Sequence, residues 1–191
     1  MDRDDIADGG SGIFALTISA IRRQSPQCRI EVLIPDFSGR TNDLYTVLNA
    51  TPNILNHNIE TVERLYRMAR PGGRYDRALD LLKKSSDYRP SIPTKSGVMV
   101  GLGESLDELF STMSDLREAS CSILTIGQYL RPSIAHLPVI KYYHPDEFKM
   151  LQEHASGLGF HHVESGPRVR RSYHAHEQAN AAESSHTTCS A

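Results

Sequence analysis

Short apolar runs alternate along the chain with longer stretches in which apolar residues recur at helical spacing. Runs of this length, rich in β-branched residues and closed by Pro, Gly or polar residues, are typical of buried strands. On this basis we predict strands over residues 29–35, 53–60, 94–102, 122–127 and 161–164.

The stretches between these runs have amphipathic helical patterns. Thr61 is placed to cap one helix, which Pro71 ends, and Ser105 is placed to cap another. Further helices are expected over 14–23, 44–48, 75–84 and 145–157. Strands separated by single helices favour βαβ units and a parallel α/β sheet, either open or curled into a barrel. From Glu177 onward no apolar periodicity remains, which predicts a disordered tail.

Polar and glycine-rich segments follow several of the predicted strands. Functional residues of parallel α/β folds gather at the carboxyl ends of the strands. This rule selects Asp36 and the segments 57–60, 101–104 and 128–131 as candidates. A ligand site on one edge of the sheet is therefore expected.

Two of these segments contain residues suited to a small polar ligand. Asn58 and Glu60, separated by one residue, would point the same way on a strand and could hold a ribose or an amino-acid headgroup. The alternative is a polar strand end with an Asn-rich turn. The stretch 96–104 (SGVMVGLGE) has glycines that permit close backbone approach to a ligand, or that simply serve a strand-to-helix turn. It lacks the spacing of a dinucleotide-binding fingerprint.

Composition and charge narrow the class of protein. The chain has 191 residues, 39% of them apolar, and a formal net charge of −2. This near-neutral balance gives no electrostatic reason to expect nucleic-acid binding. No apolar run approaches the ~20 residues of a membrane-spanning helix. We expect a soluble protein without a membrane partner, and the acidic residues 1–10 do not resemble a targeting segment.

Cysteines and histidines offer little support for a metal site. The three cysteines, Cys28, Cys121 and Cys189, are far apart, so they cannot form a disulfide framework or present clustered thiolates to zinc or iron. A reducing compartment is favoured. Histidines at 161, 162, 174 and 176 could suggest zinc, but no cysteine lies close to any of them along the chain. Arginines at 168, 170 and 171 could bind an anion, although a solvated charge cluster is the more usual interpretation.

Several long segments nevertheless resemble one enzyme family, lipoyl synthase, whose members are radical S-adenosylmethionine (SAM) enzymes. The similarity extends from Asp2 to about Gln178. It is carried, in order, by DRDDIADGG, IEVLIPDFSG, HNIETV, RPGGRYDRALDLLK, IPTKSGVMVGLGE, ILTIGQYLRPS, HLPV and SGPRVRRSYHA.

The resemblance implies a reaction and a fold. Lipoyl synthase inserts two sulfur atoms, at C6 and C8 of a protein-bound octanoyl group. One [4Fe-4S] cluster cleaves SAM to a 5′-deoxyadenosyl radical, and a second cluster is the sulfur source. The implied fold is a partial (β/α)6 barrel without its first strands. Residues 1–165 would be the C-terminal part of the barrel, 166–176 a cluster-ligand motif and 177–191 the tail.

The resemblance also assigns roles to individual residues. Nucleoside-binding positions are matched by Asn58, Glu60, Gly97, Gly101 and Glu104. Substrate-facing positions are matched by Gln128 and Arg131. Arg170-Arg171-Ser172-Tyr173 stands where the family has Arg-Ser-Ser-Tyr, which makes Ser172 the ligand of the sulfur-donating cluster. The expected partners are octanoylated lipoyl-carrier domains or the glycine-cleavage H-type protein, in mitochondria of a eukaryote or the cytoplasm of a bacterium.

One departure from the family affects activity. Both cysteine motifs that hold the clusters precede the matched segments in the family, and this sequence contains neither. The chain by itself is therefore expected to be inactive, as a fragment, a truncated gene product or a degenerate copy would be. The alternative is a non-catalytic remnant that binds the octanoylated carrier or a nucleoside.

Overall fold

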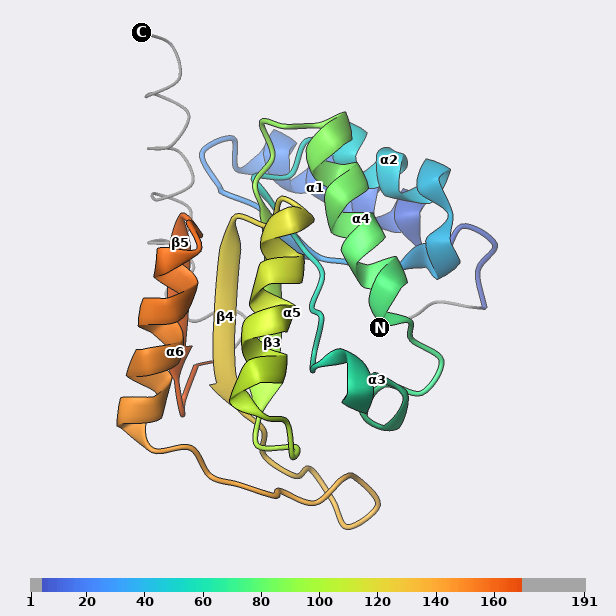
Figure 1. The fold of residues 1–191 in the computed structure, drawn as a ribbon. Coiled ribbons are helices and arrows are strands. Elements are labelled where there is room, and N and C mark those ends of the chain that lie inside the picture. The colour runs from blue at the N-terminus through green and yellow to red at the C-terminus, as the bar shows by residue number, and fades with distance from the viewer. Residues whose placement is uncertain (1–4, 170–191) are drawn as a thin grey trace, which may run out of the picture.

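A computed structural model of the chain describes residues 5–169, which form a parallel β-sheet with helices packed against it (Figure 1). The strands are β1 (Glu31–Leu33), β2 (Ile54–Asn56), β3 (Thr94–Val100), β4 (Ile123–Gln128) and β5 (His162–Gly166). The helices are α1 (Ser11–Gln24), α2 (Thr41–Asn49), α3 (Glu63–Ala69), α4 (Tyr75–Tyr88), α5 (Leu106–Glu118) and α6 (Pro145–Gly157), with a 3₁₀ turn at Phe37–Gly39. The predicted parallel α/β class is confirmed.

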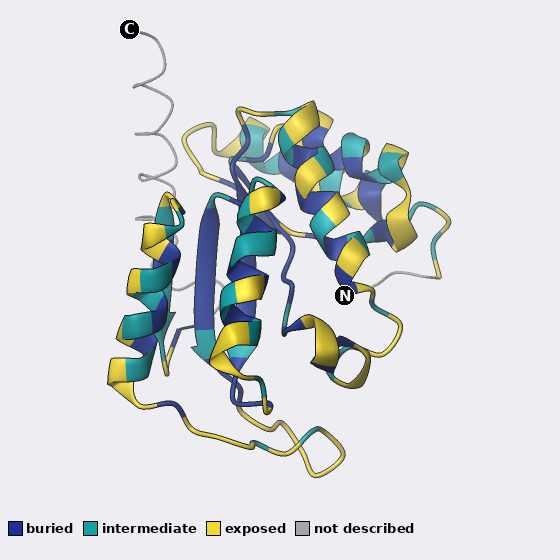
Figure 2. Cartoon of the chain, viewed as in Figure 1, coloured by how far each residue is buried: buried dark blue, intermediate teal, exposed yellow. Residues whose placement is uncertain are grey.

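The strands lie in the sheet in the same order as in the chain, β1-β2-β3-β4-β5, and every pair is parallel. Right-handed crossovers between strands in this order bring the connecting helices to the same face of the sheet. Apolar side chains of that face pack with the helices into the main core, and helix sides turned away from the sheet are exposed (Figure 2). The strand residues in this core include Val32, Leu55, Val98, Leu124 and Ile126.

The opposite face of the sheet is mostly polar. Because side chains alternate along strands, the register places Asn56 beside Lys95 and Gly97 beside Thr125 on that face. Lys95 is fully buried and its Nζ lies 3.0 and 3.1 Å from the two carboxylate oxygens of Glu31. This face therefore holds charged and hydrogen-bonding groups, in contrast to the apolar face below the helices.

Several predicted boundaries are wrong. The second strand ends at Asn56 rather than at residue 60, and the chain continues as an irregular segment that touches β3 through one bridge, Glu60 with Val98. Thr61 does not cap α3, which begins at Glu63 after Val62 and has no side-chain cap. Helices α2 and α4 are longer than expected. Pro71 does follow the end of α3, as predicted.

The predicted tail over 177–191 and most of the motif over 166–176 lie outside the described residues. Within residues 5–169 no helix is long and apolar enough to cross a membrane.

The start of α5 confirms the cap expected at Ser105. Its Oγ accepts from the Glu108 backbone N–H, and the Glu108 carboxylate accepts from the Ser105 N–H at 2.8 Å, a capping box. Arg64 on α3 also donates to Glu108, through Nε at 2.6 Å. The hydrogen bond from Arg64, followed by that from Ser105, lowers the pKa of Glu108 to about 2.

Replacing Glu108 by Gln is expected to weaken the pH dependence of the free energy of unfolding at acid pH. A carboxyl with a lowered pKa in the folded state adds stability above its unfolded pKa, and this is lost as the pH falls through the folded pKa. For Glu108 the window runs from its ordinary value of 4.5 down to about 2. Urea unfolding at pH 7, 5 and 3 should show that the free energy of unfolding falls less with decreasing pH in the variant than in the wild type. An unchanged pH profile would contradict the role of this carboxylate.

Candidate functional site

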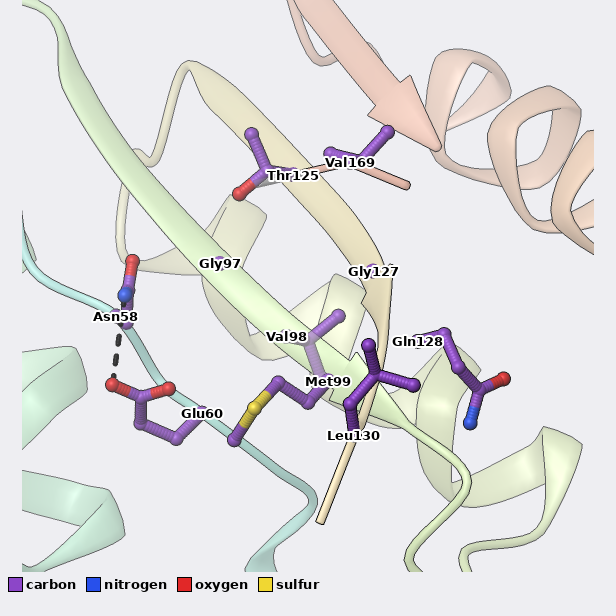
Figure 3. Close-up of a pocket in the computed structure, with 10 residues that line it drawn as sticks. All are labelled: Asn58, Glu60, Gly97, Val98, Met99, Thr125, Gly127, Gln128, Leu130 and Val169. Atoms are coloured by element: carbon purple, nitrogen blue, oxygen red, sulfur yellow. Dashed lines mark hydrogen bonds between the residues drawn. The ribbon is translucent and has the colours of Figure 1, made fainter. Parts of the chain in front are cut away.

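A pocket of about 230 Å³ opens at the polar face, toward the carboxyl ends of β3 and β4 (Figure 3). One side is formed by the segment after β2, and the floor by the two strands. The lining residues are Asn58, Glu60, Gly97, Val98, Met99, Thr125, Gly127, Gln128, Leu130 and Val169. Three of the five residues expected to bind a nucleoside, Asn58, Glu60 and Gly97, thus lie together, although Asn58 and Glu60 are not on a strand.

Asn58 supplies an unused hydrogen-bond acceptor at this pocket. Its side-chain nitrogen donates to Glu60 Oε1 at 3.5 Å, but its Oδ1 is buried and has no partner among residues 5–169. The residue as a whole is only 4% exposed. A buried acceptor without a partner is unfavourable unless a ligand donates to it. The pocket is therefore suited to a ligand with hydroxyl or amine donors.

Gly97 is required by the packing of the pocket floor. A Cβ at this position would lie 2.8 Å from Thr125 Oγ1 and 2.9 Å from Asn58 Oδ1. Any side chain would push apart the two polar groups that flank the glycine. The absence of a side chain lets these two polar groups approach β3 closely at the pocket that Gly97 lines.

Glu60 holds a strained backbone conformation beside the pocket. Its φ is +68°, in the left-handed region that non-glycine residues rarely adopt. Two backbone hydrogen bonds to β3 hold it there: Glu60 N–H donates to Gly97 O at 2.9 Å, and Met99 N–H donates to Glu60 O at 2.8 Å. Strain of this kind is commonly found at ligand sites, where it aims a side chain at the ligand.

Three other expected site residues make hydrogen bonds or contacts that support the pocket edge, and one of them, Gln128, also lines the pocket. Glu104 accepts from the backbone N–H groups of Gly101 (2.6 Å) and Leu102 (2.9 Å), which fixes the turn after β3. Gln128 Nε2 lies within 3.2 Å of three carbonyl oxygens, those of Val100, Tyr129 and Lys141. Figure 3 shows its amide pointing away from Asn58 and Glu60. We therefore assign Glu104, Gly101 and Gln128 to the support of the pocket edge.

The remaining two expected site residues are Arg131 and Ser172. Arg131 lies in the exposed loop after β4, and its guanidinium donates to the carbonyls of His136 and Ile134. Ser172, the expected cluster ligand, lies outside the described residues.

The segments 96–104 and 128–131 selected from the sequence contain Met99 and Leu130, but sequence reasoning missed Thr125, Gly127 and Val169. Thr125 faces Gly97 in the β3–β4 register, and Met99 faces Gly127. Leu130 and Val169 add apolar surface to the pocket. Only the pairing of β3 with β4 could have identified Thr125, because its own sequence context is that of an ordinary buried strand.

Residues 5–169 do not fit a metal centre. They contain no group of three or more His, Cys, Asp or Glu side chains that could hold a metal ion. Burial raises the pKa of the Cys121 thiol to about 12, so the thiolate that would bind iron is disfavoured. His162, one of the candidate zinc ligands, instead contacts Glu164 at 3.0 Å.

Comparisons with known proteins confirm the resemblance found in the sequence. No family model matches the chain. The lipoyl synthase of Koribacter versatilis is 56% identical over 181 residues, covering 95% of this chain and 60% of that protein. The lipoyl synthase of Shouchella clausii is 55% identical over 181 residues, covering 95% of this chain and 59% of its own length. The chain thus spans about three-fifths of the curated relatives that it matches.

A solved structure shows only a weak similarity. The radical SAM methyltransferase TsrM of Kitasatospora setae, described with cobalamin and a [4Fe-4S] cluster bound, aligns with 63% of this chain and 24% of its own. The TM-score is 0.46 and the sequence identity 13%, a similarity too low to support a functional conclusion.

Proposed function

We propose that this chain, a homologue of lipoyl synthases over nearly its whole length, is a portion of such an enzyme and that its pocket binds the nucleoside of SAM. The supporting sequence observation is 52–56% identity to curated lipoyl synthases over most of the chain. The supporting structural observation is the buried Asn58 Oδ1 without a partner, beside Glu60 and above the glycine of β3. In this proposal Asn58 and Glu60 bind the ribose hydroxyls, and Gly97 leaves room for the base.

The same proposal extends to the fold. Five parallel strands in chain order with their helices on one face have the arrangement of a barrel segment. A doubly wound sheet reverses its strand order and carries helices on both faces. We propose that the sheet is part of a six-stranded partial barrel whose inner face carries the pocket.

The proposed reaction is insertion of two sulfur atoms into an octanoyl group bound to a carrier domain or to an H-type protein. Met99, Leu130 and Val169 give the pocket an apolar side, which suits an acyl chain next to a polar nucleoside. In lipoyl synthases iron–sulfur clusters supply the electron and the sulfur. The described residues do not fit such clusters, so the role proposed for this chain is to bind and orient the nucleoside and the octanoyl chain. The proposed compartment is the mitochondrion of a eukaryote or the cytoplasm of a bacterium.

Binding of 5′-deoxyadenosine to the 191-residue chain tests the nucleoside site. Titration calorimetry should detect binding, and Asn58→Ala should weaken it about ten-fold because one buried hydrogen bond is lost. Gly97→Ala should abolish it, since the added methyl displaces Asn58 and Thr125. Asn42→Ala, at an exposed amide on α2, is the matched control and should bind as the wild type does. No detectable binding by the wild-type chain would reject the proposed site.

A non-catalytic chain is the second candidate, favoured by the widely separated cysteines. Anaerobic reconstitution of the chain with iron and sulfide is expected to yield no [4Fe-4S] cluster. The reason is that a cluster needs several closely placed thiolates. Mössbauer spectroscopy and iron analysis would measure this. A stoichiometric cluster would show that the chain carries its own iron site and would remove this alternative.

A further inference from the structure

The segment that carries Asn58 and Glu60 lies between the end of β2 and the start of α3 and has no regular secondary structure of its own. Contacts with its neighbours must therefore hold both side chains at the pocket. Ile59 N–H donates to Ser96 Oγ at 3.0 Å, and Glu60 is bound to β3 through its backbone. These contacts all come from β3, on one side of the segment.

Arg70 provides a contact to Asn58 from outside β3. Its Nη1 donates to the backbone carbonyl of Asn58 at 3.1 Å and lies 3.5 Å from the Tyr66 hydroxyl. Asn58 is almost fully buried, so this carbonyl has little access to water. A charged donor to a buried carbonyl makes a stronger hydrogen bond than a neutral one. The guanidinium thus holds the residue whose side chain faces the pocket.

The turn after α3 keeps Arg70 in this position. The Arg70 N–H donates to Tyr66 O at 2.8 Å, and the Gly73 N–H donates to Arg70 O at 3.0 Å. A Cβ at Gly73 would lie 2.8 Å from Cδ and 2.9 Å from Cγ of Arg70, so the glycine backbone packs directly on the stem of the arginine. Tyr66, buried and in edge-to-face contact with Tyr75 at 5.6 Å, supports the guanidinium from below. Arg70 has little freedom to leave the Asn58 carbonyl.

We infer that Arg70 is a positioning residue of the pocket: by binding the Asn58 carbonyl it orients the Asn58 carboxamide and keeps Glu60 in its left-handed conformation. The inference rests on the proposed function only where it is tested by nucleoside binding. Arg70 does not line the pocket and is not expected to touch the ligand. Its effect on binding is therefore expected to pass through the segment that carries Asn58 and Glu60.

A double-mutant cycle in the 191-residue chain tests this pathway. Arg70→Met should weaken 5′-deoxyadenosine binding about five- to ten-fold in the wild-type background and by a smaller factor in Asn58→Ala, where only its effect on Glu60 remains. Arg67→Met, at an exposed arginine of α3, the helix that ends just before Arg70, is the control and should change binding in neither background. Equal weakening by Arg70→Met in both backgrounds would overturn the inference, because it would show an effect independent of Asn58.

Rescue separates positioning from general loss of structure. Arg70→Lys, which keeps a charged donor, and methylguanidinium added to Arg70→Met should each restore part of the affinity. Amide hydrogen exchange gives a readout that needs no ligand: exchange of the Glu60 and Met99 N–H groups should rise in Arg70→Met, while that of β4 stays unchanged. If the wild-type chain binds no nucleoside, the proposed function fails but exchange at Glu60 still decides the inference. Unchanged exchange there would overturn it.

Discussion

Replacing Glu31 by Ala is expected to lower the free energy of unfolding by about 3–5 kcal/mol, because it removes a carboxylate from a buried ammonium group. Lys95 is 0% exposed, and its Nζ is 3.0 Å from Glu31 Oε1. Asn56 also donates to Glu31, at 2.9 Å, so the substitution removes an acceptor from two buried donors. Urea unfolding of the chain at pH 7 would measure the loss.

Two comparison variants make this result specific. Asp87→Ala breaks the exposed pair Lys83–Asp87 on α4 and should cost less than about 1 kcal/mol. The double replacement Glu31→Leu with Lys95→Met should cost much less than Glu31→Ala, since it removes the buried ammonium together with its carboxylate partner. A loss from Glu31→Ala as small as that from Asp87→Ala would mean that Lys95 reaches water or another partner readily.

Gly101→Ala is expected to destabilise the chain by about 3 kcal/mol or more, through backbone strain and overpacking together. Gly101 has φ +106°, and a Cβ would lie 2.5 Å from the backbone oxygen of Lys141 and still closer to Gln128 Nε2. The turn cannot yield easily, because Glu104 accepts from the Gly101 N–H and Ile140 donates to its carbonyl. The added methyl therefore forces the loop after β4 away from β3.

Thermal or urea unfolding would measure this effect, with Gly157→Ala as the control. Gly157 is the last residue of α6, and a Cβ there meets nothing within 4 Å. The control should leave stability unchanged or raise it by about 0.5–1 kcal/mol, since alanine has less freedom to lose on folding. If the stability of Gly101→Ala matched that of this control, Gln128 and Lys141 would not pack closely against Gly101 as described.

Local signals in the sequence predicted what depends on near neighbours. The β-branched run of β3, the Ser105 cap and the stop at Pro71 each act within one turn or one strand, so their effects could be read from the residues themselves. The resemblance to lipoyl synthase was also visible in the sequence, because long segments matched in order. Together these predicted a parallel α/β fold and placed Asn58, Glu60 and Gly97 at one edge.

Only the tertiary structure decided which of the candidate residues face the pocket. Glu104 and Gln128 had the same polar character as Glu60 in the sequence, yet their side chains are occupied by backbone groups of neighbouring turns. Thr125 joined the site because β4 pairs with β3 in one particular register. The partners of Lys95 and of the Asn58 carbonyl come from β1 and from the end of α3. Hydrogen bonds across strands and between distant turns depend on register and crossover geometry, which no local pattern of residues specifies.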